Sequence, residues 1–361
     1  MGRGGELSGG LDSAIVAGSL AATGQAGRAR FLNFHGDWRE GDERPWAEAV
    51  AHRLELDLAT VRKPVEAITL RQLRPLGESV RPALQGVDVT SDGEVAARMR
   101  RGRATALVTG QGGDADFFQA PDPAVAADRF RREGPPGLSP AFLAAVGRWT
   151  RHSAWTVLGC ALGLRDRTPA RVRAAASVAG EPRGSAAGQD RTDAPVRQRP
   201  AVLGRLPARP RRGFAPSLLS QPVVEHCLAI PADRLIAGVR DRGLARRAFA
   251  DRLPPMLIER RNKGDLSCFY GHVTRASLAS LRPLLLNGLQ VDQGLLDGKA
   301  LERDLAEDRL IVGPGYNRLL VGAVLEVWAQ NWEGRIADIR PHGSRLSLVR
   351  MGSGGGAAWP G

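Results

Sequence analysis

Two kinds of apolar run alternate along the first 120 residues, and their order restricts the fold more than any other feature of the sequence. The strand-like runs are 4–7, 29–34, 58–61 and 105–109, and the runs with helical character are 13–20, 46–54 and 94–101. Strands that alternate with helices predict an α/β fold, a parallel sheet with helices on both faces. In such sheets ligands bind at the carboxyl ends of the strands.

Beyond residue 120 the composition divides the chain into further parts. We expect residues 139–164 to be helical. Residues 165–212 hold twelve arginines, no lysine and four acids among Pro, Ala and Gly, so 151–215 is expected to be a helix followed by a flexible insertion. The spacing in 216–340 predicts a mostly helical C-terminal half, and the Gly/Ser-rich tail 341–361 is expected to be disordered.

The positive charge is concentrated in this insertion. The whole chain has a net charge of +13, and residues 165–212 carry +8 of it, which leaves +5 for the rest. Aromatic residues that could stack on bases do not occur among these arginines until Phe214. We therefore expect no nucleic-acid partner.

The chain shows no sign of membrane insertion or secretion. No apolar run reaches the roughly 18 residues that a membrane span needs, and the first six residues lack the apolar core of a signal peptide. Cys160, Cys227 and Cys268 lie far apart and form no CxxC pair, so neither a zinc site nor a disulfide framework is predicted. A cytoplasmic location fits these features best.

The residues Ser8-Gly9-Gly10-Leu11-Asp12-Ser13 join the first strand-like run to the first helical run. The glycines allow a sharp turn, and the start of a helix offers free N–H groups and a positive dipole end that suit a phosphate. Ser8 and Ser13 add hydroxyl donors. Asp12 would repel a phosphate unless Mg²⁺ bridged the two, so the loop predicts an anion site with a bound magnesium ion.

A second glycine-rich segment, Thr109-Gly110-Gln111-Gly112-Gly113-Asp114, follows the strand-like run at 105–109. The ends of neighbouring parallel strands meet at one edge of a sheet, so this segment is expected to lie near the first loop. Asp114 would then supply a second carboxylate for the same magnesium ion.

Both segments resemble those of a known family. The string 8–13 resembles the pyrophosphate loop of ATP pyrophosphatases that adenylate a substrate, and its last four residues resemble the asparagine synthetase version. Residues 109–118 are similar to the TGDGGDE-x-F segment of that family, with Gln111 and Ala115 in place of two acids. Residues 41–51 resemble a packing helix of the family, with Asp42 as its N-cap.

The resemblance implies an adenine nucleotide alpha-hydrolase-like fold, with ATP and Mg²⁺ bound between the two loops. Residues 1–150 would be the ATP-binding core, and 216–340 the helical C-terminal part of the same synthetase domain. The implied ATP- and pyrophosphate-binding residues are Leu7, Ser8, Gly9, Gly10, Asp12, Ser13, Thr109, Gly110, Gly112 and Gly113. Asp12 and Asp114 are the implied metal ligands, and Asp114 is also an implied catalytic residue.

Lys263 is the second implied catalytic residue. The string 260–265 resembles a segment of the family in which a lysine reaches the nucleotide phosphates and the reacting centre. A lysine there would stabilise charge on the leaving pyrophosphate.

The order of strings in the C-terminal half resembles one subgroup more closely. Residues 219–231, 240–249, 263–264 and 294–297, with Gln111, look like the asparagine-synthase-related cyclases of lasso peptide biosynthesis. The resemblance implies that an Asp or Glu side chain of a precursor peptide is adenylated and then joined to the peptide N-terminus as a macrolactam. A leader-binding protein and a leader protease are the implied partners.

Three alternatives remain open at this point. The first is an asparagine synthetase half that uses ammonia: residue 2 is Gly2 rather than a nucleophilic cysteine, so a glutaminase-like domain would have to be supplied separately. The second is a truncated, non-catalytic nucleotide-binding homologue. The third is a tRNA-modifying pyrophosphatase, against which the absence of paired cysteines counts.

Overall fold

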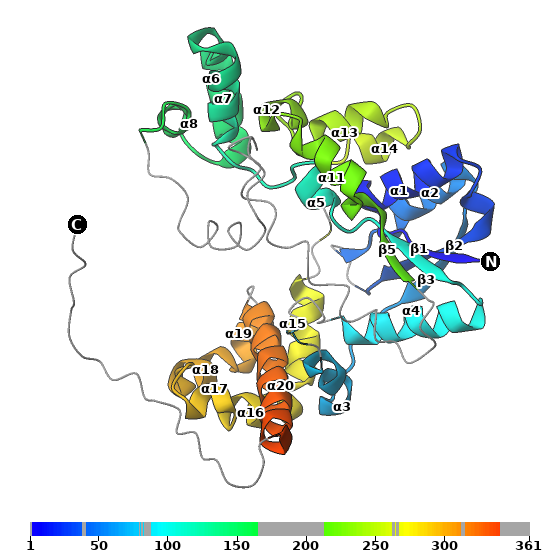
Figure 1. Cartoon of the computed structure of the whole chain (residues 1–361), viewed down its shortest axis with the longest axis vertical. Coiled ribbons are helices and arrows are strands. Elements are labelled where there is room, and N and C mark those ends of the chain that lie inside the picture. Colours follow the sequence, from blue (N-terminus) through cyan, green and yellow to red (C-terminus); the bar gives the residue numbers. More distant parts are fainter. Residues whose placement is uncertain are drawn as a thin grey trace.

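A five-stranded parallel sheet forms the centre of the N-terminal half. The computed structural model describes residues 2–37, 41–78, 80, 82, 88–164, 213–261, 264, 267–311 and 315–339. The strands are β1 (Arg3–Glu6), β2 (Ala29–His35), β3 (Asp57–Arg62), β4 (Ala106–Thr109) and β5 (Gly213–Pro216), in the order β3-β2-β1-β4-β5. All four pairings are parallel, which confirms the predicted sheet (Figure 1).

The register brings the carboxyl ends of the central strands to one edge. Arg3 of β1 pairs with Ala29 on one side and with Ala106 on the other. The chain segments that leave β1, β2 and β4 therefore start next to one another, and ligands bind at this edge in α/β sheets.

Among the strands of the described residues, β5 is the one that the sequence did not predict. It pairs with β4 from Ala106 to Thr109, and its first three residues lie at the end of the range assigned to the insertion. Its sequence, Gly-Phe-Ala-Pro, has no alternating pattern and contains a proline, which a sheet accepts at an edge strand.

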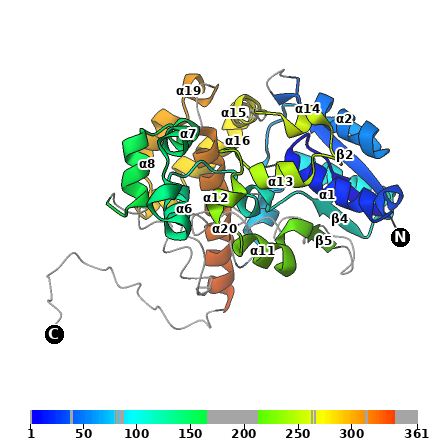
Figure 2. The ribbon, with the colours of Figure 1, turned by 90° about the horizontal axis from the view of Figure 1, so that it is seen from above.

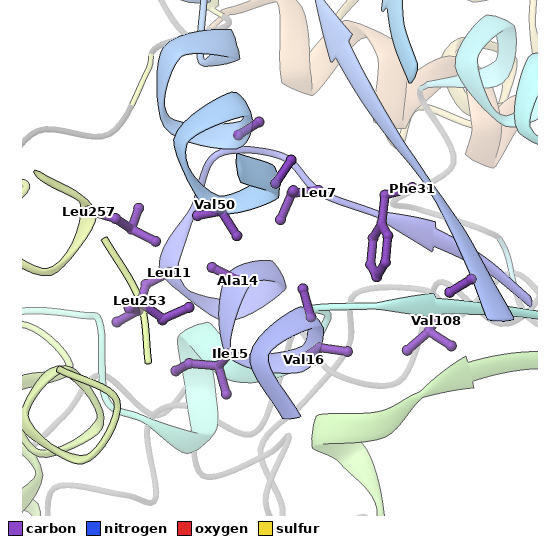
Figure 3. Packing of buried hydrophobic residues seen from close by; sticks show 14 of the residues in the cluster. Leu7, Leu11, Ala14, Ile15, Val16, Phe31, Val50, Val108, Leu253 and Leu257 are labelled. Atoms are coloured by element: carbon purple, nitrogen blue, oxygen red, sulfur yellow. The ribbon is translucent and has the colours of Figure 1, made fainter. Parts of the chain in front are cut away.

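Helices cover both faces of the sheet, as predicted. α1 (Leu11–Ala22) and α2 (Arg44–Leu54) pack on one face against Phe31 and Val108 (Figure 3). α4 (Val89–Arg101) lies on the other face (Figure 1). Its Val95 and Met99 form one core with Leu32 and Leu107 of the sheet. Phe31 and Leu32 are successive residues of β2, so alternation along the strand supplies both cores.

The part of the chain that follows β4 is mostly helical, as predicted. Its helices up to the insertion are α5 (Gly113–Asp116), α6 (Val125–Glu133), α7 (Pro140–Thr150) and α8 (Ala154–Ala161). Those after β5 are α11 (Gln221–Leu228), α12 (Ala232–Leu235), α13 (Gly243–Ala248), α14 (Pro255–Ile258), α15 (Ser267–Ala276), α16 (Leu278–Leu286), α17 (Leu289–Asp292), α18 (Gly298–Asp304), α19 (Glu307–Ile311) and α20 (Gly315–Ile339). A short helix, α3 (Leu70–Leu73), precedes α4.

Two of these helices return to the sheet and help to position its carboxyl edge. α13 and α14 lie beside α1 and α2 in both views (Figures 1 and 2). Leu257 of α14 and Leu253, which precedes that helix, are buried in the same core as α1. The C-terminal half therefore contributes to the site that the N-terminal loops begin.

Some expectations fall outside the described residues. The arginine-rich stretch 165–212 and the tail 341–361 are among them, so their flexibility stays a prediction. Within the ranges given above, no helix combines the length and the apolar character that crossing a bilayer requires.

Glu326 of α20 shows how the C-terminal helices are held together. Its fully buried carboxylate accepts hydrogen bonds from the N–H groups of Leu289 (2.7 Å) and Gln290 (3.1 Å), at the start of α17. The amides of Gln290 and Gln330 donate to it as well. Burial raises the pKa of Glu326, but the hydrogen bonds from Gln290 and Leu289 lower it, and the net pKa lies below its usual value.

We expect Glu326→Gln to lower the free energy of unfolding by about 1–3 kcal/mol at pH 7, because a charged acceptor of several hydrogen bonds is lost. Since the pKa of Glu326 is depressed in the folded state, its contribution is present above the unfolded value and disappears as the pH falls through the folded pKa. Urea unfolding at several pH values measures this. Glu333→Gln, at an exposed position of the same helix, is the control and should change little; a deficit for Glu326→Gln that persisted unchanged in acid would contradict the assignment.

Candidate functional site

The chain makes a tight turn after β1 and enters α1 without a side-chain cap. Leu7 is fully buried, and its carbonyl accepts a hydrogen bond from the amide of the buried Asn33 (2.8 Å). Gly9 has a φ of +80°, and a Cβ there would lie 2.5 Å from the carbonyl oxygen of Glu43. Gly10 is the N-cap of α1 and provides no side-chain acceptor, so the first N–H groups of α1 are left for a ligand.

The two serines of this loop hold its shape. The hydroxyls of Ser8 and Ser13 lie 3.2 Å apart, and the Ser8 N–H donates to the Ser13 hydroxyl at the same distance. The Ser13 hydroxyl donates in turn to the Gly10 carbonyl (3.1 Å), and the Gly10 N–H donates to Ser8 (3.3 Å). Both hydroxyls therefore bind the loop itself in this structure.

The segment after β4 lies directly against the first loop, at the edge where the sequence placed both. A Cβ at Gly110 would lie 2.4 Å from the Ser13 nitrogen, and one at Gly113 would lie 2.5 Å from the Asp12 carboxyl carbon. Gly112 has a φ of +99°. Gly110 and Gly113 allow a contact between the two loops that any larger residue would prevent.

A buried arginine joins the two carboxylates that the sequence identified as metal ligands. The Nη1 of Arg242 lies 2.8 Å from Asp12 Oδ2 and 3.1 Å from Asp114 Oδ1. Burial lowers the pKa of the Arg242 guanidinium, the neighbouring carboxylates raise it, and its net pKa lies above the ordinary arginine value. The shared Arg242 guanidinium therefore holds the Asp12 and Asp114 carboxylates close together.

Two carboxylates are too few to complete the coordination of a metal ion that takes all its ligands from protein, but they suit Mg²⁺. Among the described residues, no group of three or more His, Cys, Asp and Glu side chains is placed to hold a metal ion. Mg²⁺ is commonly bound through one or two carboxylates together with the phosphates of a substrate. Asp12 and Asp114 could hold it in this way.

A small basic pocket of about 140 Å³ opens at the start of α1. Its lining residues are Gly10, Leu11, Gln119, Asp241, Arg242, Arg246, Leu257, Arg260 and Arg261. Arg246 is committed to the fold, because its Nη1 donates to the carbonyls of Leu257 and Ile258. The other guanidiniums and the N-terminus of α1 make the pocket suitable for an anion.

Lys263 lies outside the described residues, but Arg260 before it is bound to the glycine loop and to Glu43, and Gly264 after it is bound to Glu43. Arg260 donates to the Gly9 carbonyl (2.8 Å) and to Glu43 Oε1 (2.7 Å), and its guanidinium lies 3.9 Å from the ring centre of Trp46. The N–H of Gly264 donates to the same Glu43 oxygen (2.9 Å). Described residues on both sides of Lys263 are therefore held at Glu43, whose carbonyl lies beside Gly9.

Sequence reasoning did not assign roles to Arg242, Arg260 or Glu43. Arg242 and Arg260 occur in strings that carry the family resemblance, which was the available signal. The N-cap prediction for Asp42 was wrong by one residue, because α2 begins at Arg44 and its N-cap is Glu43. Asp42 instead accepts from the N–H (3.1 Å) and the side chain (2.7 Å) of Arg44.

A parallel sheet that offers an open helix N-terminus and two carboxylates at one edge defines an α/β domain suited to a polyanion such as a nucleotide. A family model described as asparagine synthase matches residues 4–198 and 215–330, more than half of the chain. The chain therefore belongs to the asparagine synthase family, whose members are ATP-dependent amide ligases that generally use Mg²⁺. A comparison with curated proteins finds no match.

We expect Gly110→Ala to separate the two loops, because the added Cβ would overlap the backbone of Ser13. The free energy of unfolding should fall by about 1–3 kcal/mol, and the binding of pyrophosphate in the presence of Mg²⁺ should be lost. Thermal unfolding and titration calorimetry measure the two effects. Gly27→Ala is the matched control, since a Cβ there meets open space, and equal behaviour of the two variants would contradict the close contact.

Arg242→Met should leave Asp12 and Asp114 close together without their shared counter-charge. Breaking a buried ion pair costs about 3–5 kcal/mol, and we expect added Mg²⁺ to restore part of this loss by replacing the missing cation. The measurement is the unfolding midpoint as a function of Mg²⁺ concentration. Arg247→Met, exposed on the same helix, serves as the control, and the prediction fails if Mg²⁺ stabilises both variants equally.

Proposed function

We propose that this chain forms an amide bond by adenylating a substrate carboxylate with ATP, and that it is a lasso peptide macrolactam cyclase. The observation that carries the adenylation step is the contact between the two glycine loops, which puts Asp12 and Asp114 against one guanidinium. The cyclase assignment is supported by the strings in the C-terminal half and by Gln111 and Ala115.

The phosphates of ATP would be bound by two sets of groups, hydrogen-bond donors of the protein and a magnesium ion. The first N–H groups of α1 and the guanidiniums of Arg242 and Arg260 would hold the phosphates, because they converge on the pocket at Gly10. A magnesium ion bound to Asp12 and Asp114 would neutralise further phosphate charge.

The proposed reaction has two displacements. In the first, an oxygen of the substrate carboxylate bonds to the α-phosphorus of ATP, and the bond from that phosphorus to the pyrophosphate oxygen breaks. Arg242, Arg260 and Lys263 would stabilise the negative charge that develops on the departing pyrophosphate. In the second, an amine bonds to the activated acyl carbon, AMP leaves with the electrons of the C–O bond, and the amine loses a proton.

The amine that we propose is the N-terminus of the same peptide whose Asp or Glu side chain is activated. Ala115 and Gln111 replace two acids of the asparagine synthetase pattern, which argues for a different acceptor. A precursor peptide is then the substrate, and a leader-binding protein and a leader protease are proposed partners.

The test is incubation of the purified chain with Mg²⁺, ATP and a linear candidate core peptide, with peptide mass and AMP measured together. Loss of one water per peptide with an equal amount of AMP would support the cyclase. AMP formed only with free aspartate and ammonia would make the chain an asparagine synthetase half. ATP binding with neither product would indicate a non-catalytic homologue.

Three substitutions connect the activity to the site. Asp12→Asn and Asp114→Asn should each abolish Mg²⁺-dependent release of pyrophosphate, since each removes a charged metal ligand. Lys263→Ala should lower turnover by about 100-fold or more while ATP still binds, on the scale of losing one transition-state donor. Lys299→Ala, at an exposed lysine, is the control, and full activity of Lys263→Ala would overturn the role of that residue.

A further inference from the structure

A second pocket, of about 370 Å³, lies at the same edge of the sheet but away from the glycine loops. It is bounded by the ends of β2 and β3, the start of α4 and the side of α15. Phe34, Lys63, Asp88, Ser91, Phe269 and Tyr270 are the lining residues that matter here. The volume is in the range of small-molecule sites.

The floor of this pocket holds a buried ammonium group. Lys63 is 9% exposed, and its Nζ lies 2.5 Å from Asp88 Oδ2. The same nitrogen lies 5.6 to 5.9 Å from the ring centres of Phe34, Phe269 and Tyr270. An ammonium has three N–H groups, and its one hydrogen bond to a described residue is the bond to Asp88.

The start of α4 offers more donors to the same pocket. Asp88 is the N-cap of this 13-residue helix, but its carboxylate makes no capping hydrogen bond and faces Lys63 instead. The Asp88 side chain therefore does not cap the N-terminal amides of α4. Ser91 is only 7% exposed, and it lines the pocket as a further hydroxyl donor.

The other charges around the pocket are engaged elsewhere. Arg62 pairs with Asp37, and Glu94 pairs with Arg98 and Arg101. Glu66 is exposed at the rim. Inside the pocket, the Asp88 carboxylate neutralises the Lys63 ammonium but takes up one of its three N–H groups. The other two N–H groups, the Ser91 hydroxyl and the α4 amides can donate, so the pocket suits a group that accepts several hydrogen bonds, such as a carboxylate.

The use of lysine at this position is itself informative. Of the 51 cationic residues of the chain, only Lys63, Lys263 and Lys299 are lysines. Ammonium is a compact charge with donors that rotate, whereas a guanidinium is a rigid planar fork. A lysine between three aromatic rings can keep Asp88 and still turn N–H groups toward a ligand.

We infer that this pocket binds a second carboxylate of the substrate, distinct from the one that is adenylated. The inference rests on the proposed function, because it adds a specificity site to the same reaction. The pocket is next to the reacting edge: β2 pairs with β1, and Asn33 of β2 holds the Leu7 carbonyl at the start of the glycine loop. α15, which supplies Phe269 and Tyr270, begins four residues after Lys263.

The carboxylate can come from two sources, and two matched pairs of probes distinguish them. L-aspartate and L-aspartic acid α-amide share the side-chain carboxylate but differ in the second one. A linear core peptide with a free C-terminus and the same peptide with a C-terminal amide differ in the same way. Binding of each probe to the full chain is measured by titration calorimetry without ATP, so that the result does not depend on turnover.

We expect the acid of at least one pair to bind about tenfold or more tightly than its amide. Lys63→Met should remove this preference, and Ser91→Ala should weaken binding of that acid by about threefold. Lys299→Met is the matched control and should bind as the wild type does. The pair that shows the preference identifies the carboxylate as the α-carboxylate of an amino acid or the C-terminus of a peptide.

A second measurement keeps the inference testable if Lys63→Met does not fold. With three lysines in the chain, acetylation by an N-hydroxysuccinimide ester can be followed at each by mass spectrometry, with Lys299 as the internal reference. The preferred acid should protect Lys63 several-fold, and its amide should not.

The inference is overturned if acid and amide bind equally, or if the preference survives in folded Lys63→Met. Acid-specific binding without any AMP formation would support the pocket and count against the proposed function. AMP formation by Lys63→Met with an unchanged KM for the substrate would support the proposed function and count against the pocket.

Discussion

The ion pairs of Arg242 with Asp12 and Asp114 hold together parts of the chain that are far apart in sequence. Asp12 lies in the first turn of α1, Asp114 lies in α5 after β4, and Arg242 is the N-cap of α13 in the C-terminal half. The Asp12 and Asp114 carboxylates would repel each other, and Asp12 is mostly buried, so the Arg242 guanidinium offsets a repulsion that water screens only in part. The same charge balance thus holds two carboxylates at the carboxyl edge of the sheet, where the proposed magnesium ion would bind.

Glu43 has a comparable linking role on the other side of the glycine loop. One of its oxygens accepts from both Arg260 and Gly264, while Arg260 also binds the Gly9 carbonyl. The turn after β1, the start of α2 and the segment around Lys263 are therefore joined through one carboxylate. A reaction that needs groups from both halves of the chain requires such a link, because positions must be held to a fraction of an ångström.

The sheet, its two helical faces and the meeting of the two glycine loops could be predicted from the sequence. Alternating runs determine a parallel sheet, and parallel strands end at one edge, so the neighbourhood of residues 8–13 and 109–114 follows from topology. β5 could not be predicted, because four residues with a glycine and a proline carry no periodic signal. Arg242 could not be placed either, since its contact with Asp12 spans 230 positions and depends on a left-handed backbone (φ 53°) that non-glycine residues rarely adopt.

The strand pairings also differ in how much chain they enclose. Arg3 meets Ala29 across a short connection, but it meets Ala106 only after β2, β3 and α4 have intervened, and Ala106 meets Gly213 across a further long stretch. Contacts between distant residues form slowly, because the entropy of closing the loop is lost before the contact stabilises the chain. We therefore expect the three strands β1, β2 and β3 to associate earlier in folding than the carboxyl edge of the sheet, which also needs β4. A nucleotide that binds only the completed edge would slow the reopening of this last-formed part of the molecule.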